Sequence, residues 1–274
     1  WYFVVLIWAL KINVDIFAEA RGFQPLEMAK IIAAGSEKLF EARKERSAPY
    51  KDDKILTAWN GLMIAAFALG GRALNAPEYT RGAEKAADFI LTHLQKQGRL
   101  LRRYREGESA VSAFQDDYAC LALGLLELYE TTLNVRWLEE AKRLTDLMLE
   151  LFWDEVAGGF FYTAKDSEKL INRPKEYYDG AVPSGNSIAA LVLLKISRMT
   201  GNPEYEERAG KIILSNAAAL NSHPISFPAL LAARILNIPV VIHESDTIPG
   251  RVNLWAGKFA LRVAVSYKEA AQYF

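Results

Sequence analysis

The chain has 274 residues, 51% of them hydrophobic and 24% charged, which is the composition of an ordinary folded protein and excludes a disordered one. Its 33 basic and 33 acidic residues cancel, so the net charge gives no reason to expect nucleic acid or an anionic membrane surface as a partner. The single cysteine, Cys120, excludes an internal disulfide and favours a reducing, cytoplasmic location.

The N-terminal stretch, "WYFVVLIWAL", consists of ten apolar residues. It is too short to span a bilayer, which requires ~20 residues, and it lacks the basic flank of a signal peptide. We therefore expect no integral membrane segment. Residues 1–12 are interpreted as an unmatched apolar segment of a truncated chain.

Helices of two kinds alternate along the next two hundred residues. The segments "TAWNGLMIAAFALGGRAL", "FQDDYACLALGLLELYETT" and "VPSGNSIAALVLLKISRMT" are rich in Ala, Gly and Leu and carry few charges. This composition predicts helices that are deeply buried. Each is followed by a more amphipathic segment, one of which places Trp137, Ala141, Leu144, Met148 and Leu151 on one stripe.

An asparagine stands between the two helices of each pair. Asn75, Asn134 and Asn202 precede residues typical of a first helical turn, and asparagine is a favoured N-cap. The pairs are joined by long connections with strand-like content, "GRLLRRYREGE" and "GGFFYTAKDSEKLINRPKEYYDGA". Buried helices inside and amphipathic helices outside predict a mainly α fold, an incomplete α/α toroid. A solenoid of short helical repeats is the second choice, because its units would be tighter.

In such a toroid the long connections lead to the N-termini of the inner helices, which carry free N–H groups and a positive partial charge. Candidate substrate-binding residues at the first helix are Asp53, Trp59 and Asn60, and Tyr118 lies at the second. The candidates before the third helix are Arg173, Lys175, Tyr177, Ser184 and Asn186. The candidate catalytic carboxylates are Asp116, Asp117, Glu176 and Asp179.

Carboxylates beside aromatic rings suit a sugar, because the rings stack on it and paired carboxylates can perform acid–base chemistry. Structural roles remain open at the same positions. Asp116 and Asp117 could simply cap a helix, and Trp59 could belong to the core. Arg173, Lys175 and Glu176 could form an ion-pair network that holds the connection in place.

The sequence shows no metal or cofactor motif: it contains no CxxC, HExxH, P-loop or GxGxxG pattern. We therefore predict no metal and no cofactor. The three histidines do not stand at the inner-helix starts, which argues against a sugar epimerase that moves a proton with a histidine pair.

Four stretches identify a resemblance to a known family: "DDKILTAWNGLMIAA", "FQDDYACLALGLLELYE", "LFWDEVAGGFFYT" and "RPKEYYDGAVPSGNSIAAL". Residues 13–213 resemble the C-terminal region of the thioredoxin-domain-containing, spermatogenesis-associated family, which is widespread in bacteria. The resemblance implies an (α/α)6 toroid of the six-hairpin glycosidase type, similar also to N-acylglucosamine 2-epimerase. It also implies a thioredoxin-like domain upstream in family members, and it supplies no settled reaction.

The last fifty residues change character. They predict a helix at 228–235, a strand at 238–242, a helix at 253–259 and a strand at 262–266, which is an α/β, Rossmann-like fragment with a parallel sheet. "IPVVIHESDTIPG" resembles the N-terminal domain of the MurG N-acetylglucosaminyltransferase family, through His243, Glu244 and Asn253. Asp246 stands where that family usually has Asn.

These patterns predict a partial toroid at 13–214, a junction at 215–223 and a glycosyltransferase-like fragment at 224–274, as if two unrelated coding sequences were joined. The function they favour is binding of a carbohydrate-type ligand, with the reaction open. The alternatives are a glycosyltransferase that uses UDP-N-acetylglucosamine and a non-catalytic toroid that binds a protein. The oligomeric state is left open.

Overall fold

The computed structural model describes residues 16, 18, 21–168, 171–237, 241–244 and 262–265. The chain divides into two units, Trp1–Asp53 and Lys54–Phe274. In the first unit, α3 spans Pro25–Lys44, with proline in its first turn and Arg43 and Lys44 in its last, where they complement the helix dipole. The predicted apolar segment at residues 1–12 lies outside the described residues.

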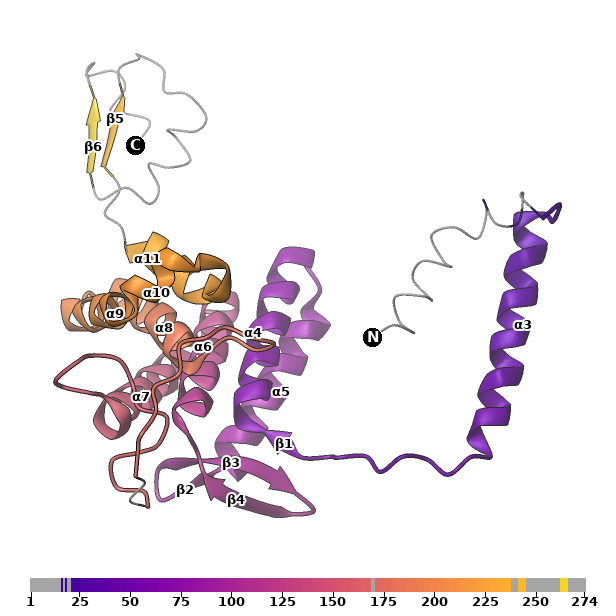
Figure 1. Cartoon of the computed structure of the whole chain (residues 1–274), viewed down its shortest axis with the longest axis horizontal. Helices are drawn as coiled ribbons and strands as arrows, with labels where there is room; N and C mark the ends of the chain where they lie inside the picture. Colours follow the sequence, from indigo (N-terminus) through magenta and orange to yellow (C-terminus); the bar gives the residue numbers. More distant parts are fainter. Residues whose placement is uncertain are drawn as a thin grey trace. The chain divides into compact units, whose positions relative to one another are not determined.

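The second unit is built from three helix hairpins (Figure 1). Their bounds are α4 Thr57–Leu74 with α5 Pro77–His93, α6 Gln115–Thr132 with α7 Val135–Phe152, and α8 Gly185–Thr200 with α9 Pro203–Ser215. The helices α4, α6 and α8 pack side by side in that order, and each of the other three packs against its own hairpin partner. The predicted arrangement of inner and outer helices is confirmed.

The contact between α4 and α6 depends on glycine. A Cβ atom on Gly61 would lie 2.5 Å from the backbone carbon of Cys120, and one on Gly124 would lie 2.6 Å from the carbonyl oxygen of Gly61. No side chain fits at either position, so the two backbones meet directly. This close contact fixes the position of the α4 N-terminus against α6.

Burial of the inner helices is uneven. Twelve of the 18 residues of α6 and 11 of the 16 residues of α8 are buried, as predicted. The prediction is wrong for α4, where Trp59, Met63 and Phe67 are 62%, 53% and 38% exposed. The reason is that α4 packs against α5 and α6 and, within the described residues, its opposite face is exposed.

Two of the three predicted asparagine caps are confirmed. Asn134 accepts a hydrogen bond from the backbone N–H of Arg136, and Asn202 accepts one from Glu204. Asn75 is not an N-cap. It ends α4 in the left-handed conformation, with φ of 52°, which asparagine tolerates better than most residues.

The connection between α5 and α6 forms three strands, as its strand-like sequence predicts, and these make a small antiparallel sheet with a short strand that precedes α4. Its strands are β1 Ile55–Leu56, β2 Gln95–Lys96, β3 Arg99–Arg105 and β4 Glu108–Ser112. The central strand β3 pairs with the other three, and Arg103 lies opposite both Leu56 and Ala110. Because β1 leads directly into α4, the sheet ties β3 to the α4 N-terminus.

The connection between α7 and α8 forms no strand in its described part, contrary to prediction; it has only an isolated bridge between Trp153 and Phe160. Side chains replace the expected strand partners. Asn186 accepts a hydrogen bond from the N–H of Phe160 at 2.7 Å and donates to the carbonyl of Phe160 at 2.9 Å.

At the end of the chain, the first predicted helix and the two predicted strands are present in the predicted order. This part of the chain contains α10 Ala217–Ser222, a 3-10 turn Pro224–Ser226, α11 Pro228–Asn237, and the parallel strands β5 Val241–Glu244 and β6 Arg262–Val265. The predicted helix at 253–259 lies outside the described residues.

The helix α11 packs against α8 and α9 and places Leu230 and Ala233, both fully buried, in the same core as the hairpins. The N-terminus of α11 is capped by a residue that is distant in the sequence. Asp179 Oδ2 accepts the N–H of Ala229 at 2.8 Å and that of Leu230 at 3.4 Å, while Oδ1 accepts the N–H of Ser184 at 2.9 Å.

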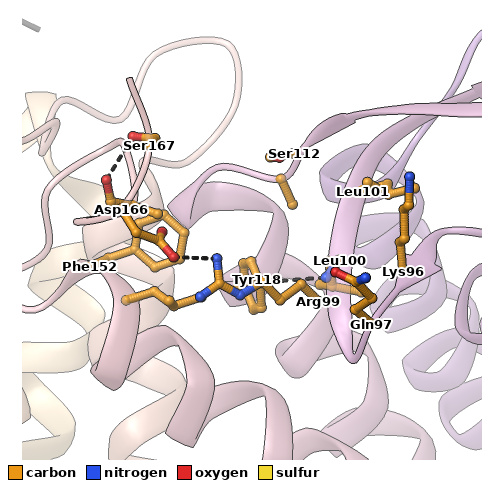
Figure 2. Close-up of a pocket in the computed structure, with 13 residues that line it drawn as sticks. Lys96, Gln97, Arg99, Leu100, Leu101, Ser112, Tyr118, Phe152, Asp166 and Ser167 are labelled. Carbon is orange, nitrogen blue, oxygen red and sulfur yellow. Dashed lines mark hydrogen bonds and ion pairs between the residues drawn. The ribbon is translucent and has the colours of Figure 1, made fainter. Parts of the chain in front are cut away.

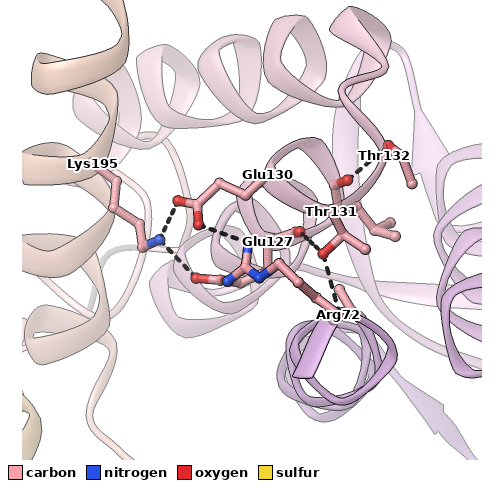
Figure 3. A network of polar contacts seen from close by, with 8 residues as sticks. Arg72, Glu127, Glu130, Thr131, Thr132 and Lys195 are labelled. Carbon is pink, nitrogen blue, oxygen red and sulfur yellow. Dashed lines mark hydrogen bonds and ion pairs between the residues drawn. The ribbon is translucent and has the colours of Figure 1, made fainter. Parts of the chain in front are cut away.

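Opposite charges join the three inner helices near the C-terminal end of α6 (Figure 3). Lys195 of α8 lies 2.7 Å from Glu127 and 2.5 Å from Glu130, and Arg72 of α4 lies 3.1 Å from Glu130. Glu127 is almost fully buried. Two carboxylates and two cations therefore balance one another at this end of the helices.

The close contact of α4 and α6 predicts that Gly61→Ala lowers the free energy of unfolding by about 2 kcal/mol, because the added methyl group overlaps backbone that cannot move aside. Gly70→Ala, on the same helix, is the matched control. A Cβ there meets nothing within 4 Å, so stability should rise by about 0.5–1 kcal/mol. Urea unfolding measures both, and equal effects would contradict the prediction.

The cap supplied by Asp179 predicts that Asp179→Ala lowers the free energy of unfolding by about 1–2 kcal/mol, because three backbone N–H groups lose their acceptor. Hydrogen exchange should become faster at Ala229 and Leu230. Asp166→Ala removes an ion pair in which both side chains are 46% exposed, and we expect it to change stability by less than about 0.5 kcal/mol. Unchanged exchange at Ala229 in Asp179→Ala would contradict the assignment.

Candidate functional site

The N-terminal turns of α4, α6 and α8 meet. Asp117 Oδ1 in α6 accepts the backbone N–H of Ala58 in α4 at 3.0 Å. At the start of α8, a Cβ on Gly185 would lie 1.9 Å from Gln115 Oε1 and 3.1 Å from the Cα of Asp116, so these two helix starts are also in direct contact. Three helix N-termini, each with a positive partial charge, therefore surround the aspartate pair.

Asp117 is fully buried and both of its carboxylate oxygens accept hydrogen bonds. Besides Ala58, it accepts the N–H of Phe114 at 2.9 Å and Nη1 of Arg102 at 2.9 Å, both on Oδ2. Burial and the neighbouring Asp116 raise the pKa of Asp117 to about 6, against the lowering effect of Arg102 and the two N–H groups.

Asp116 has a different environment. Its Oδ1 lies 3.1 Å from Arg102 Nη1, and 24% of its side chain is exposed. Among the described residues, Arg102 is the only group hydrogen bonded to this carboxylate. Asp116 therefore keeps acceptor capacity for a ligand, which Asp117 does not.

Aromatic rings adjoin the aspartate pair. The Arg102 guanidinium lies 4.9 Å from the centre of the Phe114 ring, and Phe114 stacks on Tyr162 with 4.7 Å between ring centroids. Burial and the charge of Asp116 raise the pKa of Tyr162 to about 12, so its phenol remains a hydrogen-bond donor near neutral pH. Trp59, next to Ala58, is largely exposed rather than part of the core, and Asn60 donates to the carbonyl of Leu56, the last residue of β1.

The sequence did not reveal Arg102, Phe114 or Tyr162 as site residues. Arg102 lies in a predicted strand, where alternate side chains face opposite sides, but the sequence alone does not decide whether Arg102 or Arg103 faces the aspartates. Phe114 stands two residues before Asp116, which is a weak signal. Tyr162 reaches the site through a connection without regular structure.

The connection before α8 mainly uses its candidate residues to hold itself together. Arg173 donates to the carbonyl of Thr163, and Lys175 pairs with Asp154 at 2.6 Å. Ser184 caps α8, and the hydroxyl of Tyr177 forms a hydrogen bond with the hydroxyl of Ser215. Asn186 bonds the backbone of Phe160 and Glu176.

Two of the candidate carboxylates differ in their surroundings. Glu176 is exposed, and its charge contributes to the raised pKa of Tyr162. Both oxygens of Asp179 are occupied by backbone N–H groups, so the structure gives this residue a capping role.

Tyr118 lies apart from the aspartates, in the lining of a cavity of about 250 Å³ (Figure 2). Its hydroxyl accepts the N–H of Leu100 at 3.1 Å, and its ring packs against Phe152. The ion pair of Arg99 with Asp166 closes part of the same cavity. Tyr118 is therefore a core and cavity residue rather than a member of the aspartate site.

Other predicted positions cannot be assigned to this site. Asp53 belongs to the N-terminal unit. His243 and Glu244 stand at the end of β5, and Asp246 and Asn253 lie outside the described residues. Across the described part of the chain, no cluster of three His, Cys, Asp or Glu could hold a metal ion, and no helix is long and apolar enough to cross a membrane.

Sequence comparison matches most of the chain to spermatogenesis-associated protein 20. The human protein is 32% identical over 235 residues, which cover 82% of this chain and 30% of the human protein. The mouse protein is 33% identical over 233 residues, which cover 81% and 30%. This chain thus spans less than a third of the length of these curated relatives.

A different family matches the end of the chain. The model of the glycosyltransferase family 28 N-terminal domain matches residues 216–265. The UDP-N-acetylglucosamine–N-acetylmuramyl-(pentapeptide) pyrophosphoryl-undecaprenol N-acetylglucosamine transferase of Rubrobacter xylanophilus is 51% identical over 49 residues, which cover 18% of this chain and 15% of that protein.

Solved structures show the fold. The GH76 alpha-mannanase of Bacteroides thetaiotaomicron has a TM-score of 0.53 and 18% identity, covering 63% of this chain and 47% of that one. An inactive alpha-1,6-mannanase variant from Salegentibacter, with two adjacent aspartates replaced and in complex with alpha-1,6-mannotetrose, has a TM-score of 0.50 and 18% identity, covering 70% and 53%. The predicted fold, an incomplete toroid of the six-hairpin glycosidase type, is thereby confirmed.

Most of this chain is homologous to spermatogenesis-associated protein 20, and its residues 216–265 match the N-terminal domain of glycosyltransferase family 28.

Proposed function

We propose that this chain binds a carbohydrate at the joined N-termini of α4, α6 and α8. The observation that carries the proposal is the partly exposed carboxylate of Asp116 at a point where three helix starts meet. Trp59 supplies an exposed aromatic surface at the start of α4, and aromatic faces stack on sugar rings. Asp116 accepts hydrogen bonds from sugar hydroxyls, and charge-assisted hydrogen bonds are the stronger ones.

A solved relative in fold supports the choice of ligand. The alpha-1,6-mannanase from Salegentibacter is inactive when two adjacent aspartates are replaced, and it holds alpha-1,6-mannotetrose. The present chain also has an adjacent pair, Asp116 and Asp117, at the start of an inner helix. Within the proposal, Asp116 and Glu176 are the candidate acid–base groups, whereas the buried Asp117 is held by Ala58, Phe114 and Arg102 and Asp179 acts in capping.

The match of residues 216–265 favours a second candidate function, the use of UDP-N-acetylglucosamine by the C-terminal segment. The parallel pairing of β5 with β6 is the arrangement found in such α/β domains. The match covers a small part of a transferase, so we expect no binding when UDP-N-acetylglucosamine is titrated into the full chain. Binding that is lost in His243→Ala would favour this second function instead.

The carbohydrate proposal is tested by calorimetric titration of the full chain with alpha-1,6-mannotetrose and with cellobiose. We expect at least one to bind, and Asp116→Asn to weaken binding by roughly 10-fold or more, because a hydrogen bond to a charged group is lost. Asp88→Asn is the control, since Asp88 of α5 forms an exposed ion pair with Arg136 of α7 and its replacement should not affect binding. Unchanged binding in Asp116→Asn, or no binding of either sugar by the unmodified chain, would refute the proposal.

A further inference from the structure

We infer that Arg102 is the positioning residue of this site and that, of the two adjacent aspartates, Asp116 alone meets the ligand. The inference rests on the proposed function and assigns unequal roles to two carboxylates that the sequence presents as a pair. Its basis is one nitrogen atom: Nη1 of Arg102 lies 3.1 Å from Asp116 Oδ1 and 2.9 Å from Asp117 Oδ2.

Asp117 is excluded from contact with a ligand by its surroundings. No part of its side chain is exposed, and its oxygens already accept the N–H groups of Ala58 and Phe114 besides Arg102. Asp117 instead joins α4 to α6 through the N–H of Ala58, and it fixes one side of the Arg102 guanidinium. A sugar hydroxyl could reach Asp117 only after breaking these bonds.

Arg102 is held from two directions. Its strand is fixed to β1 through the pairing of Arg103 with Leu56, and β1 runs directly into α4. Its guanidinium also lies over the Phe114 ring, which packs on Tyr162. An arginine fixed in this way restricts where the Asp116 carboxylate can stand.

The charged and titratable groups around Asp117 come from three elements. Asp116 and the buried thiol of Cys120 belong to α6, Arg102 belongs to β3, and Tyr162 lies in the connection before α8. Glu176, on the same connection, acts on Tyr162. Arg102 is the only cation bonded to either aspartate among the described residues.

The test is a carbon-13 NMR titration of the Asp117 carboxyl in the full chain, which needs no ligand. Arg102→Met removes the cation and should raise the pKa of Asp117 from about 6 by about one pH unit or more, because an opposite charge favours the ionised form. Asp116→Asn should lower it, because a like charge is removed. Arg102→Lys should restore part of the unmodified value.

The matched control is Arg103→Met. Arg103 is the next residue of β3 and pairs with the exposed Glu108, so the pKa of Asp117 should not change. An unchanged pKa in Arg102→Met would overturn the inference. Should that variant fail to fold, Asp116→Asn tests the other half of the linkage: an unchanged pKa of Asp117 there would show that the two aspartates are not electrostatically linked, which also overturns the inference.

Titration with alpha-1,6-mannotetrose separates this inference from the proposed function. We expect Arg102→Lys to bind several-fold more tightly than Arg102→Met, and Asp117→Asn to weaken binding less than Asp116→Asn. A larger loss in Asp117→Asn overturns the unequal roles. If the unmodified chain binds neither this sugar nor cellobiose, the proposed function is refuted, and so is the role of Asp116 in contacting the ligand. The electrostatic linkage through Arg102 is tested separately, by the NMR titration alone.

Discussion

The direct backbone contact between α4 and α6 is the constraint on which the site depends. Because Gly61 and Gly124 have no side chains, the two helices approach until the N–H of Ala58 reaches the carboxylate of Asp117. A larger separation would leave Asp117 buried with one partner fewer, at a cost that buried charged groups rarely tolerate. Helix packing in the middle of the hairpins thus determines the electrostatics at their N-terminal ends.

The two ends of the inner helices differ in how their carboxylates are balanced by cations. At the C-terminal end of α6, Glu127 and Glu130 face two cations, Arg72 and Lys195, and the network is balanced. At the other end, two aspartates share the single guanidinium of Arg102 among the described residues. A balanced network stabilises the fold, whereas an unbalanced one retains the capacity to bind something else. This difference in balance is a physical reason for placing the proposed carbohydrate site at the N-terminal end.

The sequence was sufficient for features that depend on local composition and periodicity. The bounds of α4 and α6 follow from runs of small and apolar residues, and the caps at Asn134 and Asn202 follow from adjacent residues. Features set by distant partners could not be predicted. Asn186 satisfies the backbone of Phe160 across 26 residues, so a segment with strand-like composition needs no strand partner. The selection of Arg102 over Arg103 depends on how β3 is oriented against α6.

The helix α11 belongs by sequence to the glycosyltransferase-like segment, but it packs into the core of the helix hairpins. Residues 216–265 match a glycosyltransferase domain, yet Leu230 and Ala233 lie in the core of the helix hairpins and Asp179 caps the helix that carries them. A shortened chain that ended at Ser215, where α9 ends and the match is about to begin, would uncover the apolar surface of α8 and leave the carboxylate of Asp179 with two fewer donors. The edge of a sequence match is therefore a poor place to cut this protein, because side chains from both segments share a single interior.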